Sequence, residues 1–204
     1  MEINNTRLTN IKFAAKTKEE NCICDITKNF SRRYSLIDII NDLNRNPNLE
    51  MTSASTYKIG DEYDVILGPT QWFVDVLKNL EKIKKTGITC APLLVGKSKS
   101  ATEHYSIMVV KHPKPNKKNP IFLENQNVVS SANKAKFVDE LTRFCRETQL
   151  YNPCILDNPE LLIVTDNDEL YMSEWYSLKK FSSDTQKNEW FNRLRKFLNL
   201  EKTN

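Results

Sequence analysis

The sequence predicts a single domain of the α/β or α+β class, with a central mixed sheet flanked by helices. Amphipathic stretches with helical spacing alternate with short apolar runs, in the order helix, strand, helix, three strands, helix, strand, helix. The 204 residues are 39% hydrophobic, which is enough for a substantial core. We expect residues 31–204 to form this domain. Residues 1–30 are expected to form an N-terminal arm with the polar composition of a non-cleaved export signal.

The first half of the domain is expected to hold a helix, a strand and a second helix. Ser35 can cap a helix whose apolar positions recur at helical spacing until Asn46-Pro47 stops the pattern. Residues 63–67 alternate as a strand, and Gly68-Pro69 ends it. A longer amphipathic helix follows and ends at Thr86-Gly87.

Three apolar runs, at residues 90–95, 105–110 and 121–123, predict the core of the sheet. The Pro- and Lys-rich segment 111–119 between the second and third runs is expected to be an exposed loop. An apolar stripe over residues 133–146 predicts a helix, residues 160–165 predict another strand, and the last helix starts near Ser183.

Composition excludes several classes of function. With only four glycines, at positions 60, 68, 87 and 96, the chain cannot build a Walker loop or a dinucleotide fingerprint. The formal charge of +4 is too small to indicate nucleic-acid binding. Five irregularly spaced cysteines, with one close pair at Cys22 and Cys24, suit reduced thiols rather than a disulfide framework or a metal site. No apolar run is long enough for a membrane span.

The clearest catalytic candidate is a pairing of His104 with Glu124. His104 stands at the head of the apolar run 105–110, and Glu124 ends the run 121–123. A hairpin of these two strands brings the imidazole and the carboxylate to the same end of the sheet. The carboxylate can then orient the imidazole as a general base, as in nucleophile, base and acid triads. The alternative is a surface histidine beside an unrelated glutamate, with His112 as an exposed loop residue.

Several short segments agree in order and spacing with one known family. His104 opens a strand, the pair Lys111-His112 follows it, and after a polar turn an aliphatic strand ends in Glu124. Upstream lie SLIDIINDLNRNPNLEM and QWFVDVLKNLEKIKKTG; downstream lie ELLIVT and SEWYSL. Together, over residues 33–182, they resemble the YopJ family of bacterial effector acetyltransferases.

The resemblance implies a nucleophile at Ser173, where the family has a cysteine. Asn167 falls where related proteases carry a side chain that stabilises the oxyanion. Ser173 can be read as an inactivating replacement of cysteine, as the natural residue of an inactive relative that only binds targets, or as a working serine. The last requires the imidazole to remove a proton of much higher pKa than that of a thiol.

The resemblance also implies the fold of the ubiquitin-like-protein protease clan and a role as a virulence effector. Such effectors are secreted by a bacterium into the host cell cytoplasm. There they transfer acetyl groups from acetyl-CoA to Ser, Thr or Lys of host proteins, often signalling kinases. Many need inositol hexakisphosphate. Six cations could bind this polyphosphate or be a solvated helix face: Lys179, Lys180, Lys187, Arg193, Arg195 and Lys196.

Three alternatives stay open. A deubiquitinase or ubiquitin-like-protein protease would use the same fold and triad. Separately, LDNPELLIVTDNDELYMSEW resembles a protein-kinase catalytic loop and the metal-binding strand after it, with Asp157 and Glu174 in the acidic roles. Leu162 stands where a kinase needs its metal-binding Asn, so a kinase-like pseudoenzyme is included. The third alternative is a binding or immunity protein with no active site.

Overall fold

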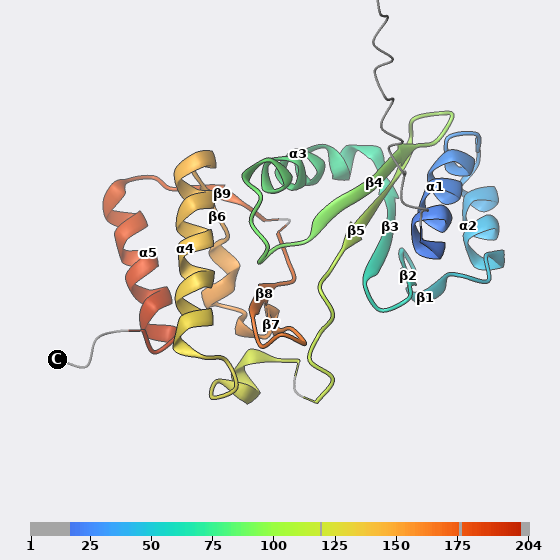
Figure 1. Ribbon diagram of the computed structural model, residues 1–204. Helices are drawn as coiled ribbons and strands as arrows, with labels where there is room; N and C mark the ends of the chain where they lie inside the picture. The colour runs from blue at the N-terminus through green and yellow to red at the C-terminus, as the bar shows by residue number, and fades with distance from the viewer. Residues whose placement is uncertain (1–16, 119, 176, 201–204) are drawn as a thin grey trace, which may run out of the picture.

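The structure, a computed structural model, describes residues 17–118, 120–175 and 177–200, except for the side chains of residues 124 and 125. Over these ranges the chain is a mixture of helices and antiparallel strands (Figure 1). The five strands of the main sheet are β1 (Glu50–Ser53), β2 (Thr56–Ile59), β3 (Tyr63–Pro69), β4 (Leu93–Lys99) and β5 (Tyr105–Lys111). Their order is β1-β2-β3-β5-β4, and every neighbouring pair is antiparallel. The α/β class is confirmed, but the sheet is antiparallel rather than mixed.

Helices cover both faces of this sheet, as expected. One face packs against α1 (Lys18–Phe30) and α2 (Leu36–Arg45), and the other against α3 (Thr70–Thr86) (Figure 1). Alternation along β5 produces this division, because Ile107 and Val109 belong to one buried cluster while Met108 and Val110 belong to the other. A strand that is buried on both faces has a continuous apolar run in its sequence. This run is the signal that predicted β5.

Helix α1 corrects the expectation of a loose arm up to residue 30. Thr17 and Glu20 form a capping box at its start, and Ile23, Ile26 and Phe30 are buried against the sheet. Gly96 of β4 permits the close approach, because a Cβ there would lie 3.1 Å from Cγ2 of Ile23. Residues 1–16 of the predicted arm lie outside the described part of the chain.

The C-terminal half is organised around α4 (Ser131–Thr148) and α5 (Asp184–Phe197), whose buried side chains belong to one cluster (Figure 1). Two small antiparallel pairs accompany them. Strand β6 (Leu150–Tyr151) pairs with β9 (Lys179–Lys180), and β7 (Leu162–Val164) pairs with β8 (Leu170–Met172). Trp175, fully buried, packs edge-on against Phe144 of α4 at 5.0 Å between ring centroids.

A glutamate on α4 ties this half to the loop between α3 and β4. Glu140 Oε2 accepts hydrogen bonds from the backbone N–H groups of Thr89 (2.6 Å) and Cys90 (2.9 Å), and Oε1 accepts one from the Thr89 hydroxyl. Burial alone would raise the pKa of Glu140, but these hydrogen bonds outweigh it and lower the pKa. The Cys90 carbonyl in turn accepts from the N–H of Met172 in β8.

The predicted strand at residues 121–123 is wrong. Ile121 makes only an isolated bridge to Ile163, and Phe122–Asn125 form a 3-10 helix. The physical reason is that β3 and β4 already occupy both edges of β5. The strand predicted at residues 90–95 is also displaced, since β4 begins at Leu93.

Candidate functional site

The structure does not form the hairpin that was to bring His104 and Glu124 together. His104 immediately precedes β5, and its backbone carbonyl accepts a hydrogen bond from the N–H of Thr70 at 2.9 Å. Glu124 lies in the 3-10 helix that follows the other end of β5. A seven-residue strand separates its ends by about 20 Å. The imidazole of His104 is exposed, and the side chain of Glu124 lies outside the described residues.

Ser173 and Asn167 lie at opposite ends of β8. Asn167 is exposed in the turn between β7 and β8, whereas Ser173 directly follows β8. The half-buried hydroxyl of Ser173 donates to the carbonyl of Leu161 at 3.1 Å. No hydrogen bond joins the described side chains of His104, Ser173 and Asn167. Among the described side chains, the structure thus shows no contact that joins His104 to Ser173 or Asn167.

The six cations proposed for a polyphosphate do not share one face. Lys179 and Lys180 are exposed on β9, while the other four lie on α5. At about 100° per residue, Arg193 and Lys196 lie on one side of that helix, whereas Lys187 and Arg195 point away from them. Arg193 also approaches Asp157, with Nη2 at 3.9 Å from Oδ1. This arrangement favours the solvated helix face over a polyphosphate site.

The segment that resembles a kinase catalytic loop folds as two 3-10 turns followed by the β7–β8 hairpin. The turns are Pro153–Leu156 and Pro159–Leu161. Asp157 lies between them, is exposed, and faces Arg193 of α5. Glu174 follows β8, and its backbone carbonyl accepts from the side-chain amide of Asn152 at 2.6 Å. The segment therefore has a loop followed by strands, with Asp157 in the loop and Glu174 after the last strand.

The described positions that correspond to this resemblance lack the polar residues that kinases use for phosphoryl transfer. Leu162, where a kinase needs its metal-binding Asn, is fully buried in β7. Strand β3, which precedes α3, reads YDVILGP and has no lysine. Kinases carry on their third strand the lysine that pairs with a glutamate of the next helix. Ala54 and Ser55 connect β1 to β2, without the glycines of a phosphate-covering loop.

A histidine that the sequence suggested was an exposed loop residue is instead half-buried at the junction of the two halves. His112 Nδ1 hydrogen-bonds the hydroxyl of Tyr171 in β8, and its ring meets that of Tyr171 edge-on. Nε2 lies 3.2 Å from Oδ2 of Asp64 in β3, at ion-pair distance but without the alignment of a hydrogen bond. We call Asp64, His112 and Tyr171 the junction cluster.

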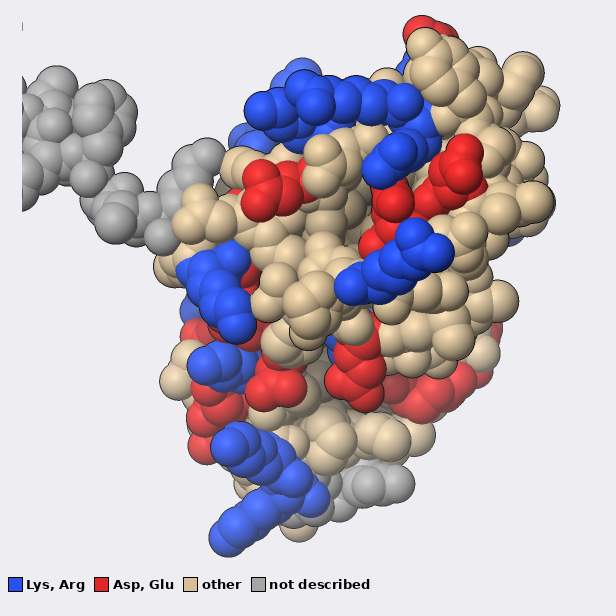
Figure 2. Space-filling model, turned by 90° about the vertical axis from the view of Figure 1, so that its right-hand side faces the viewer, with Lys and Arg blue, Asp and Glu red and all other residues tan. Residues whose placement is uncertain are grey.

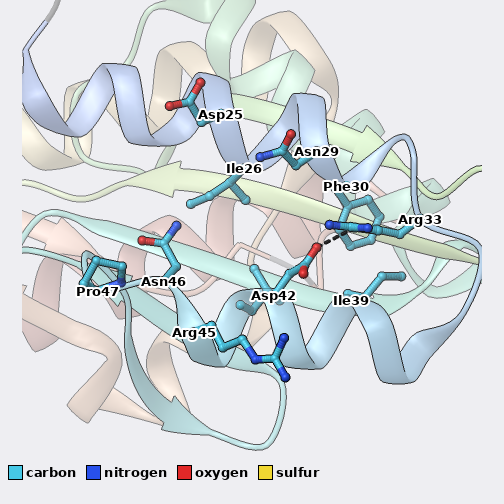
Figure 3. A pocket seen from close by; sticks show the side chains of 11 residues that line it. Asp25, Ile26, Asn29, Phe30, Arg33, Ile39, Asp42, Arg45, Asn46 and Pro47 are labelled. Atoms are coloured by element: carbon cyan, nitrogen blue, oxygen red, sulfur yellow. Dashed lines mark ion pairs between the residues drawn. The ribbon is translucent and has the colours of Figure 1, made fainter.

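A groove lies between α1 and α2 (Figure 3). Its volume is about 390 Å³, and its apolar floor comprises Ile26, Phe30, Ile39 and Leu43. Figure 3 shows the two helices side by side, with an ion pair between Arg33 Nε, in the loop that joins them, and Asp42 Oδ2 of α2 (2.5 Å).

Side chains of both signs form the rim of this groove. Asp25 and Asn29 come from α1, and Arg45 comes from the last turn of α2. Figure 2, which looks onto the side of the molecule that carries α1 and α2, shows positive and negative side chains interspersed rather than a field of one sign. A surface of this kind does not attract a polyanion such as nucleic acid.

No group of three or more His, Cys, Asp or Glu in residues 17–118, 120–175 and 177–200 could hold a metal ion. None of the helices in this part of the chain is both long and apolar enough to cross a bilayer.

Comparisons with known proteins give a distant structural similarity to solved structures, but no match by sequence. No protein-family model matches the sequence, and no curated protein matches it. Among solved structures, the chain is similar to the kinase PK-1 of Cydia pomonella granulovirus, with a TM-score of 0.45 and 9% sequence identity. The match covers 72% of this chain and 57% of the viral kinase, less than two thirds of that protein.

Proposed function

We propose that this protein is a kinase-like pseudoenzyme that acts by binding another protein. The observation that carries this proposal is Leu162, which is buried in β7 at the position where the kinase-like segment requires a metal-binding Asn. A leucine side chain offers no ligand to Mg²⁺, which prefers oxygen donors.

The surrounding residues support the same conclusion. Catalysis of phosphoryl transfer depends on positioning the phosphates and neutralising their charge. Strand β3 supplies no lysine for the phosphates, and Asp157 faces α5. The segment still has a loop followed by the β7–β8 hairpin. It can therefore serve as a scaffold although it lacks the residues that transfer phosphate.

Acetyl transfer, the protease-like fold and secretion into a host cell stay predictions from the resemblance alone. The acetyltransferase and the protease both require His104, Glu124 and Ser173 to meet. The hairpin that would bring His104 and Glu124 together is absent, since β5 pairs with β3 and β4 and Glu124 lies in a 3-10 helix. For this reason we propose a binding function ahead of either enzyme.

The proposal is tested by thermal unfolding with and without Mg²⁺ and ATP. A ligand present at 100 times its Kd stabilises the folded state by about 2.7 kcal/mol, which raises Tm by about 5–10 °C for a chain of this size. We expect no such shift and no transfer of phosphate from labelled ATP to a general kinase substrate. An active protein kinase in the same assay is the positive control. Saturable stabilisation by Mg²⁺-ATP, or phosphate transfer, contradicts the proposal.

A second assay addresses acetyl transfer. We expect labelled acetyl-CoA, with or without inositol hexakisphosphate, to leave no label on the native chain or on Ser173→Cys. His104→Ala provides the background. Label on Ser173→Cys that disappears when His104 is also replaced would establish the triad and replace the pseudoenzyme proposal.

A further inference from the structure

Three large apolar side chains are strongly exposed at one end of the main sheet. Tyr34 is 73% exposed, Ile37 72% and Trp72 73%, the highest fractions for large apolar side chains in the described part of the chain. Single exposed apolar residues are common on protein surfaces, so the informative feature is that these three share one end of the fold. We call Tyr34, Ile37 and Trp72 the end residues.

The turn between β4 and β5 lies between the segments that carry the end residues. The N–H of Ala101 in this turn donates to the carbonyl of Arg33, in the connection from α1 to α2. On the other side of the turn, the carbonyl of His104 accepts from the N–H of Thr70, at the start of α3. Figure 1 shows the β4–β5 turn and the α1–α2 connection at the same end of the sheet. One surface laid across this end can therefore meet all three end residues.

The separation of the end residues favours a flat and fluid surface over a shaped protein partner. Helices α2 and α3 cover opposite faces of the sheet, so Trp72 lies on one side of the β4–β5 turn, and Tyr34 and Ile37 lie on the other (Figure 1). A protein interface has a contiguous core that is packed like a protein interior. The surface of a lipid bilayer accepts separate anchors, because its molecules rearrange around each of them. Trp and Tyr are the side chains enriched at that surface.

The charge at this end is weakly positive. Residues 28–38, 70–72 and 99–104 contain four cations and two carboxylates: Lys28, Arg32, Arg33, Lys99, Asp38 and Glu103. Within the described ranges Lys28 and Arg32 make no ion pair, whereas Glu103 is paired with Lys99. The two unpaired cations add a modest attraction to anionic lipid headgroups.

We propose that this end of the protein binds peripherally to the surface of an anionic lipid bilayer. The end residues enter the headgroup region, and Lys28 and Arg32 contact lipid phosphates. The surface is separate from the kinase-like segment in the C-terminal half. Membrane binding and the pseudoenzyme proposal can therefore fail independently of each other.

Trp72 supplies an intrinsic probe for the test. The other two tryptophans of the chain, Trp175 and Trp190, are at most 6% exposed, so contact with a bilayer changes mainly the emission of Trp72. Titration of the whole chain with phosphatidylcholine vesicles that contain about 30% phosphatidylserine should shift this emission to shorter wavelengths and saturate. Trp72→Phe should remove the shift but still sediment with the vesicles. Vesicles of phosphatidylcholine alone should bind at least about threefold more weakly.

Two matched pairs of variants locate the binding. Ile37→Ser removes an end residue, whereas Leu123→Ser makes the same kind of change at an exposed position in the C-terminal half. Arg32→Glu reverses an unpaired charge at the end of the sheet, whereas Arg146→Glu does so in the last turn of α4. Because all four positions are exposed, the folded structure should tolerate each change, which circular dichroism verifies.

We expect Ile37→Ser and Trp72→Ala each to weaken vesicle binding at least about fivefold, and Arg32→Glu at least about threefold. Leu123→Ser and Arg146→Glu should change it less than about twofold. The proposal is overturned by a chain that sediments with neither kind of vesicle, by an unchanged Trp72 emission at saturation, or by control variants that weaken binding as much as Ile37→Ser does. A lack of vesicle binding would assign the end residues to a protein partner instead.

Discussion

Nδ1 of His112 and the hydroxyl of Tyr171 share a hydrogen bond between two positions 59 residues apart in the chain. The bond connects the segment that leaves β5 to β8 in the C-terminal half. Asp64 approaches the other ring nitrogen from β3, so one imidazole contacts both halves of the molecule. The imidazole of His112 and the hydroxyl of Tyr171 are polar groups that are largely buried. Removing either one should therefore weaken the contact between the two halves.

Replacing His112 should therefore destabilise the protein. We expect His112→Ala to cost about 1–3 kcal/mol in the free energy of unfolding, because it removes the hydrogen bond between the imidazole and the hydroxyl of Tyr171. In a double-mutant cycle, His112→Ala and Tyr171→Phe should show a coupling of at least about 0.5 kcal/mol. Urea denaturation measures all three variants. His104→Ala, a change at an exposed histidine, is the control and should stay within about 0.5 kcal/mol of the native chain. Additive effects would show that the two side chains are not coupled.

Glu140 should make stability depend on pH. Its pKa is lowered in the folded state by the hydrogen bonds from Thr89 and Cys90, which outweigh the opposing effect of burial. A carboxyl group with a depressed folded pKa contributes its full stability above the unfolded value, about 4.3 for Glu, and this stability is lost as pH falls through the lower folded value. We expect Glu140→Gln to cost about 1–2 kcal/mol at pH 7, since the group is only half-buried, and to reduce the loss of stability on acidification. Urea denaturation at pH 7, 5 and 3 measures this difference. An equal loss with pH in both proteins would assign the acid sensitivity to other carboxyl groups.

The cysteines should differ in reactivity. Burial raises the pKa of Cys145 to about 12 and that of Cys90 well above its ordinary value, whereas Cys24 is exposed. Only the thiolate reacts with alkylating agents. At pH 8 we expect iodoacetamide to label Cys24 in the folded protein and Cys90 and Cys145 only in urea, as peptide mass spectrometry would show. Cys24→Ser is the control. Rapid labelling of Cys145 without denaturant would mean that α4 opens locally.

Two tryptophans provide a matched comparison of core and surface. Trp175 is fully buried against Phe144, and its indole N–H donates to the carbonyl of Met172 at 2.9 Å. Trp72 is 73% exposed. We expect Trp175→Ala to cost about 3–5 kcal/mol and Trp72→Ala less than about 0.5 kcal/mol by urea denaturation. If Trp175→Ala fails to fold, Trp175→Phe, with an intermediate loss, keeps the comparison measurable. Similar costs at both positions would contradict the placement of Trp175 in the core.

The elements that could be predicted are those whose signal is local. Ser35 caps α2 and Gly87 ends α3, as the sequence indicates. The apolar stripes of α4 and α5 are also present where they were predicted. The Thr17 and Glu20 capping box is equally local and could have revealed α1. The hairpin of β1 and β2 was not predicted. Strand β1 is exposed throughout, so its sequence has no alternation of apolar and polar residues.

The candidate sites were harder to predict, because a site depends on which strands pair. His104 does head a buried strand, but the sequence contains no signal that β3 and β4 take both edges of β5. Once they do, residues 121–123 pack beside β7, and Glu124 cannot join His104 through a hairpin. The junction cluster and the groove likewise combine residues from separate elements.

The amino-acid sequence by itself determined the α/β class, most helix boundaries and the absence of glycine-rich phosphate loops, because periodicity, caps and composition are properties of neighbouring residues. The tertiary structure alone decided the strand order, the burial of His112 and Leu162, and the pairing of α1 with α2 around a groove. Those features depend on contacts between distant segments, and hydrophobic burial selects them among the many pairings that the same local pattern allows.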